Sequence, residues 1–325
     1  MLQTHSRASR AHHVDGGFRN PNPAVREASP VEVAQWLAGQ ALGAKQNVPP
    51  HAYPVSPFND VTSGVHITWL GHASTLIRTA GLSILTDPHF GMRASPLSFA
   101  GPRRLVRPPL SIEDLPAVDL VVLSHDHYDH LDYDSVIALD ERDQPMFVAP
   151  LGCATRLRDW GIGTAHAFDW WEYDDLDLSR SSLRVHCLPA VHFSGRTPFD
   201  RNSTLWASWM LETDTLRIYF GGDTAYGDHF SAIHETFGRP DVALLPIGAY
   251  TPRSIMQPVH VNPEEAIRAA TDLGRPPMIP IHWGTFDLAA ETIQAPAAEV
   301  VRCAETANFT RELYLLRPGE TWEMA

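Results

Sequence analysis

Ser124-His125-Asp126-His127-Tyr128-Asp129-His130 is the most informative stretch of the chain, because it gathers three imidazoles and a carboxylate in the spacing H-x-H-x-D-H. Residues 118–123 before it are mostly apolar and rich in valine, so they predict a short buried strand. The stretch then lies on the loop at the carboxyl end of that strand, where a rigid scaffold commonly presents reactive side chains. It therefore predicts a metal-binding loop.

Three more candidate ligands each lie beyond an expected strand. They are His192 after 183–188, Asp223 after 217–220, and His282 after 278–281. Nitrogen and oxygen ligands without sulfur suit Zn²⁺ and also accept Fe or Mn. The alternative is that these side chains are ordinary loop residues that bind no metal.

Seven ligands are too many for one tetrahedral ion, so the set predicts two divalent metal ions. We expect His125, His127 and His192 to hold the first ion, Asp129, His130 and His282 to hold the second, and Asp223 to bridge them. Two adjacent ions polarise a phosphoryl or carbonyl oxygen and activate water, so no serine or cysteine nucleophile is needed. The site thus predicts hydrolysis.

The chain divides into three expected parts. Residues 1–28 are polar and predict a flexible N-terminal arm. Within 29–60, Ser29-Pro30-Val31-Glu32 predicts a helix start ahead of a Pro-rich linker. Residues 61–325 form the main domain, with a β-meander over 66–86 and a helix that begins after Asn262.

Composition limits the possible partners and compartments. The chain has 325 residues and a net charge of −13, which argues against a nonspecific nucleic-acid binder. Its three cysteines lie far apart without a C-x-x-C pair, which favours a reducing, cytoplasmic compartment. No apolar run approaches the roughly 18 residues needed to cross a bilayer, so we expect any membrane contact to be peripheral.

Longer runs identify a family. The ligand order after a β-meander that ends in Leu85-Thr86-Asp87-Pro88 resembles the metallo-β-lactamase superfamily, which implies an α+β fold, the αββα sandwich. Further runs resemble its N-acyl-phosphatidylethanolamine-hydrolysing phospholipase D branch. They are Trp69-Leu70-Gly71-His72-Ala73, Gly101-Pro102-Arg103-Arg104, Phe220-Gly221-Gly222-Asp223-Thr224, Leu245-Pro246-Ile247-Gly248, His260-Val261-Asn262-Pro263-Glu264-Glu265 and Ile281-His282-Trp283-Gly284.

The resemblance implies an activity and residue roles. The activity is hydrolysis of the distal phosphodiester of N-acyl-phosphatidylethanolamine to phosphatidic acid and an N-acylethanolamine, and the family's ligands match the seven positions above. Asp129, Asp223 and His260 become catalytic candidates, and Tyr128 and His260 become substrate contacts. Physical reasoning adds Asp87 and His72 as supports, since a carboxylate at a strand end can accept the free ring N–H of a ligand histidine.

Several alternatives stay open. A metal-dependent lactonase or sugar-phosphate lactonase shares the ligand set, and a non-catalytic metal-binding scaffold is a third possibility. His260 is otherwise a helix cap or a core residue, and Tyr128 otherwise packs beneath the loop. The basic segment 93–107 either guides a phosphate headgroup or is solvated. The substrate is a phospholipid or another phosphodiester, and a homodimer is left open.

Overall fold

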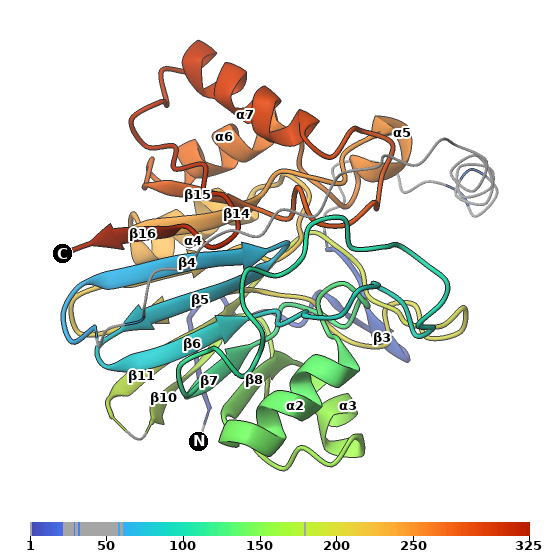
Figure 1. Cartoon of the computed structure of the whole chain (residues 1–325), viewed down its shortest axis with the longest axis vertical. Helices are drawn as coiled ribbons and strands as arrows, with labels where there is room; N and C mark the ends of the chain where they lie inside the picture. The colour runs from blue at the N-terminus through green and yellow to red at the C-terminus, as the bar shows by residue number, and fades with distance from the viewer. Residues whose placement is uncertain (1, 22–28, 30–31, 33–57, 59–60, 179) are drawn as a thin grey trace.

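The structure is a computed structural model that describes residues 2–21, 29, 32, 58, 61–178 and 180–325. Two seven-stranded sheets form its centre. Figure 1 shows the helices on the two outer sides, with α6 and α7 on one side and α2 and α3 on the other. The αββα sandwich expected from the sequence is confirmed.

The first sheet contains the meander and the strand before the metal-binding loop. Its order is β16 (Thr321–Met324), β4 (Val65–Gly71), β5 (Ser74–Thr79), β6 (Leu82–Thr86), β7 (Leu120–Val122), β8 (Met146–Pro150) and β9 (Ala165–Phe168). The strands from β16 to β6 pair antiparallel, whereas β6 to β9 pair parallel. The carboxyl ends of β6 and β7 therefore lie at one edge.

The second sheet contains the strands that precede the other candidate ligands. Its order is β1 (Gln3–Thr4), β10 (Glu172–Asp177), β11 (Ser182–Leu188), β12 (Ser208–Glu212), β13 (Arg217–Phe220), β14 (Val242–Pro246) and β15 (Met278–Ile281). Strands β13, β14 and β15 are parallel, so the loops after β13 and β15 also share an edge.

Strands of the first sheet are buried on both faces, which explains their unbroken apolar runs. Ile77 and Ile84 pack into the core between the sheets, while the adjacent Leu76 and Leu85 pack into a second core beneath α2 (Tyr133–Asp143) and α3 (Cys153–Asp159). Successive side chains of a strand point to opposite faces, so one apolar run contributes side chains to both cores. This double burial holds the ligand-bearing edge rigid.

The helix expected after Asn262 is confirmed as α6 (Pro263–Asp272). Asn262 and Glu265 form a capping box, and Pro263 occupies the first turn. The remaining helices complete the outer layers. They are α4 (His229–Phe237), α5 (Arg253–Met256) and α7 (Ala295–Thr306). Among the described residues, no helix combines the length and apolarity that crossing a bilayer requires.

The N-terminal residues differ from the flexible arm expected for 1–28. Residues 2–21 pack on the domain: β1 pairs with β10, and β2 (His13–Val14) and β3 (Gly17–Phe18) form a hairpin. Polar contacts, such as the hydrogen bonds of His12 and His13 to Asp169, hold this segment on the domain. The sequence therefore has no apolar pattern there that would predict the packing. For 29–60, Ser29 and Glu32 exchange the hydrogen bonds of a capping box, and the rest of that expected helix and linker lies outside the described residues.

Candidate metal centre

The seven predicted ligands meet where the loops of the two sheets converge. The loop after β7 supplies four of them, and the loops after β11, β13 and β15 each supply one. Gly222 has φ +57°, and a Cβ there would lie 2.5 Å from the Ser124 Cβ. Only glycine lets the chain turn this tightly against the β7 loop and bring Asp223 into the site.

Three imidazoles form the first group, here called the histidine trio: His125, His127 and His192. The Nδ1 atom of His127 lies 2.8 Å from Nε2 of His125 and 3.3 Å from Nε2 of His192. These three nitrogens therefore point at a common centre, as the facial ligands of a tetrahedral ion do.

The second group, here called the carboxylate cluster, comprises Asp129, His130, Asp223 and His282. Oδ2 of Asp223 lies 3.1 Å from Nε2 of both His130 and His282, and Oδ2 of Asp129 lies 3.4 Å from the same two nitrogens. Oδ2 of Asp223 is also 3.8 Å from Nε2 of His192. Asp223 thus stands between the two groups.

Unsatisfied atoms show that this arrangement fits a cation. Nε2 of His130, Nε2 of His282 and Oδ1 of Asp223 are buried and have no hydrogen-bond partner among the described residues. Buried polar atoms rarely stay unpaired, because desolvation costs about 1–3 kcal/mol each. The His and Asp clusters therefore fit metal binding.

Neighbouring groups orient the rings. Asp87, which is fully buried, lies 2.7 Å from Nδ1 of His130 and also accepts hydrogen bonds from the backbone N–H and the hydroxyl of Ser124. The Val259 carbonyl lies 2.8 Å from Nδ1 of His192. In each case the accepting oxygen holds the proton on Nδ1 and leaves Nε2 facing the centre.

His72 contacts the carboxylate cluster directly. Its Nε2 lies 2.8 Å from Oδ2 of Asp129, and its ring centroid is 4.0 Å from that of His282. His72 itself has φ +56°, and its carbonyl accepts the backbone N–H of His282 at 2.8 Å. The support expected from the sequence therefore has a geometric basis, because His72 touches two candidate ligands.

The protonation states of the histidine trio and of Asp223 favour metal binding, whereas burial would lower the pKa of His130 and of His282 but the carboxylates beside them raise it. Burial holds the pKa of His125 and of His192 well below the usual value, so both rings are neutral at pH 7. The neutral imidazole is the form that binds a metal. Burial would raise the pKa of Asp223, yet His130 and His282 hold the pKa of its carboxyl well below the usual range. The bridge candidate is therefore ionised.

The two predicted substrate contacts lie in different places. His260 lines a cavity of about 280 Å³ beside the ligands, with its unpartnered Nδ1 3.9 Å from Oδ2 of Asp223. Burial lowers the pKa of His260 to about 4. Tyr128 instead lies under Arg196, whose guanidinium carbon is 3.8 Å from the centroid of the Tyr128 ring. Tyr128 is not part of the lining of that cavity.

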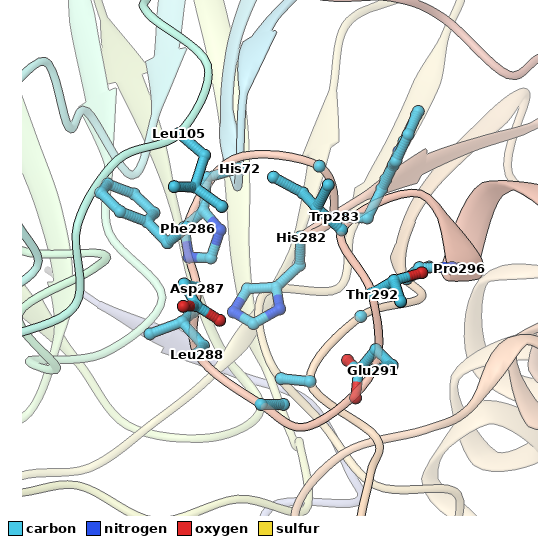
Figure 2. A pocket seen from close by; sticks show the side chains of 15 residues that line it. His72, Leu105, His282, Trp283, Phe286, Asp287, Leu288, Glu291, Thr292 and Pro296 are labelled. Atoms are coloured by element: carbon cyan, nitrogen blue, oxygen red, sulfur yellow. The ribbon is translucent and has the colours of Figure 1, made fainter. Parts of the chain in front are cut away.

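The cavity of about 280 Å³ beside the ligands has one polar and one apolar side. His127, Asp129 and Asp223 lie at the polar side, and the apolar wall is formed by Phe193, Ile255, Met256, Val259 and Leu288. A second pocket of about 30 Å³ lies between His72, His282 and the loop that follows His282 (Figure 2). That volume suits about one water molecule, so of these two pockets beside the candidate ligands the cavity of about 280 Å³ is the one that can admit a substrate.

Sequence reasoning missed several contributors. Ser124 and the Val259 carbonyl hold ligand rings, yet a serine before a histidine or a backbone oxygen carries no recognisable signal. Arg104 belongs to the basic segment 93–107, for which headgroup binding and solvation both stayed open, and it is buried against Phe286 and donates to the carbonyls of His89 and Gly91. Burial lowers the pKa of Arg104 to about 10. Its role is to tie the 93–107 loop to the domain.

Known proteins share this fold and sequence. A beta-lactamase superfamily domain matches residues 83–283. An uncharacterised protein of Mycobacterium tuberculosis is 40% identical over 316 residues, 94% of this chain and 82% of that protein. The N-acyl-phosphatidylethanolamine-hydrolyzing phospholipase D 1 of Caenorhabditis elegans is 39% identical over 248 residues, 74% of this chain and 69% of the relative. The structure of a metallo hydrolase from Ignicoccus hospitalis matches with a TM-score of 0.61 at 24% identity, covering 81% of this chain and 99% of that one.

These similarities agree with the ligand geometry. The matched domain begins within β6 and ends just after His282, so it contains all seven candidate ligands. The two relatives extend the similarity well beyond that domain. The chain therefore belongs to the metallo-β-lactamase superfamily, as a metal-dependent hydrolase of the N-acyl-phosphatidylethanolamine-hydrolysing phospholipase D-like branch.

Proposed function

We propose that this protein hydrolyses the distal phosphodiester of N-acyl-phosphatidylethanolamine, giving phosphatidic acid and an N-acylethanolamine. The observation that carries the proposal is a cavity of about 280 Å³ that joins two groups of candidate ligands to an apolar wall. A lipid phosphodiester needs both features, since its phosphate must meet cations while its chains leave water. The name and 39% identity of the nematode relative support the same choice.

The proposed site would hold two zinc ions. The histidine trio would hold one, Asp129, His130 and His282 the other, and Asp223 would bridge them. When bound, such a pair of ions polarises a phosphodiester and activates water for attack. Removing the shared carboxylate affects both ions, so Asp223→Asn should abolish hydrolysis.

The protein's own groups position the substrate. His260 lies at the junction of the ligands and the cavity, and its buried Nδ1 has no partner among the described residues, so it is placed to hydrogen-bond a phosphate oxygen or the leaving oxygen. Arg253 donates to the His260 carbonyl at 3.0 Å and pairs with Glu265, which holds this residue in place. Tyr128 stays a predicted substrate contact, which would require Arg196 to move from its ring.

A peripheral membrane contact fits the exposed apolar side chains. Phe199 is 96% exposed and Phe99 is 76% exposed, and both lie on loops between strands. Figure 1 shows these loops, which follow β11 and β6, projecting at the edge of the sandwich toward which the ligand-bearing strands run. Covering such exposed apolar side chains with an apolar surface is favourable. We propose that they contact the lipid bilayer beside the cavity.

A substrate panel tests the proposal. The zinc-loaded protein is assayed on vesicles that contain N-acyl-phosphatidylethanolamine, on an aryl phosphodiester and on a lactone. Release of N-acylethanolamine, abolished by Asp129→Asn, supports the assignment. Turnover of the lactone alone would replace it with a lactonase, and the absence of any metal-dependent hydrolysis would leave a metal-binding scaffold.

A further inference from the structure

The N-terminal hairpin contacts the loop that carries a candidate ligand. Asn20 follows β3, and its side-chain nitrogen donates to the backbone carbonyl of His192 at 2.8 Å. A carbonyl is only an acceptor, so the amide nitrogen of Asn20 must face it. The oxygen of the same amide is buried and has no partner among the described residues. Among the described residues, the His192 carbonyl is therefore the hydrogen-bond partner that orients the Asn20 amide.

A second contact joins the hairpin to the same loop. The backbone N–H of Phe18 donates to the Asn202 carbonyl at 2.8 Å, and Asn202 in turn exchanges hydrogen bonds with Ser194, two residues beyond His192. A Cβ on Gly17 would lie 2.2 Å from the Asn202 carbonyl oxygen. The hairpin is therefore pressed against this loop at a distance that only glycine permits.

The hairpin is fixed at its other end by two histidines. Nε2 of His12 and Nε2 of His13 lie 2.6 and 2.7 Å from the two carboxylate oxygens of Asp169. These are ordinary hydrogen-bond distances, shorter than the 3.1–3.4 Å between nitrogens and oxygens of the carboxylate cluster, where atoms stay unpaired. His12, His13 and Asp169 thus form a structural clasp, and they satisfy one another without an ion.

We infer that Asn20 is a positioning residue for the metal ion of the histidine trio. The His192 ring is held by the Val259 carbonyl, whereas its backbone carbonyl is held by the Asn20 side chain. Loss of the Asn20 contact frees the peptide of His192 and moves its Nε2 relative to His125 and His127. The carboxylate cluster takes none of its ligands from this loop, so the affinity for its ion should change less. This inference rests on the proposed two-metal site.

The test measures zinc affinity at each of the two sites by competition with a chromophoric chelator. Substitution of groups that orient metal ligands typically weakens binding 10- to 100-fold, so Asn20→Ala is expected to weaken one of the two zinc-binding steps by about tenfold. Asn20→Asp keeps the side-chain shape but removes the donor, and should do the same. Gln3→Ala is the matched control, because it removes a side-chain amide of the same N-terminal segment, whose oxygen accepts a hydrogen bond from the Tyr173 hydroxyl.

The outcomes separate the two proposals. One weakened zinc-binding step, with the melting temperature of the metal-free variants equal to that of Gln3→Ala, supports the role of Asn20. Unchanged zinc affinity in both Asn20 variants overturns it, and so does equal weakening of both steps together with a lower melting temperature. A wild-type protein that binds no zinc overturns this inference and the proposed function together.

Discussion

Replacing Asp87 with asparagine should weaken metal binding without changing any ligand. Asp87 is fully buried and accepts three hydrogen bonds, one from His130 and two from Ser124, at 2.5–2.7 Å. Asparagine has nearly the same shape but presents a donor where the carboxylate presents an acceptor. If the amide nitrogen faces His130, the proton of that ring shifts to Nε2, which is the nitrogen that points at Asp223.

The size of the effect follows from this tautomer change. A protonated Nε2 cannot bind a metal, so metal binding then requires the proton to move back to Nδ1, where the amide donor of the substituted side chain opposes it. Loss of such orienting partners typically costs 10- to 100-fold in affinity, or about 1.4–2.7 kcal/mol. The affinity for the ion of the carboxylate cluster should be the one that falls, since His130 belongs to that cluster.

Zinc competition with a chromophoric chelator measures this loss directly. Asp241→Asn is the matched control, because Asp241 accepts a backbone N–H from Arg217 at 2.8 Å away from the centre. We expect weaker zinc binding by Asp87→Asn and unchanged zinc binding by Asp241→Asn. Wild-type zinc affinity in a folded Asp87→Asn protein would refute the idea that this carboxylate sets the tautomer of His130.

Three further changes probe the turn, the membrane contact and the buried histidines. Gly222→Ala should lower the free energy of unfolding by about 1–3 kcal/mol in chemical denaturation, because the new Cβ meets Ser124, while Gly163→Ala, in open space, should not. Phe199→Ser should reduce vesicle binding about tenfold or more, the value of one buried phenylalanine, whereas Tyr133→Ser on α2 should not. Burial lowers the pKa of His186 to about 4, so between pH 6.5 and 4 this residue binds a proton in the unfolded chain that it lacks in the folded chain. His186 alone should therefore contribute a fall in stability of at most about 1.4 kcal/mol per pH unit, and His186→Gln should reduce the slope of the metal-free protein by that amount.

Each of these outcomes has a clear contradiction. Equal stability of Gly222→Ala and Gly163→Ala would mean that a Cβ at residue 222 does not clash with Ser124. Vesicle binding that depends on Tyr133 as much as on Phe199 would place the membrane contact elsewhere. A pH dependence of the unfolding free energy that is the same in metal-free His186→Gln as in the metal-free wild type would mean that His186 is charged in the folded state.

Local patterns predicted much of the fold. The meander over 66–86 was predictable because β-branched and apolar residues alternate between two cores, and α6 was predictable because Asn262, Pro263 and Glu265 form a capping box by sequence spacing. The N-terminal segment was not predictable. Its contacts are single polar pairs with partners far along the chain, such as His12 with Asp169, and these leave no periodic signal.

The sequence by itself determined which chemistry is available and where it enters the fold. Residue types and strand ends specify nitrogen and oxygen ligands in a set order, because ligand chemistry and strand propensity are local properties. The tertiary structure decided which atoms converge, that Arg104 is buried, and that Tyr128 lies under Arg196. These outcomes depend on how two sheets and the N-terminal hairpin pack. Packing brings together residues that are far apart in the chain, and such contacts leave no local pattern in the sequence.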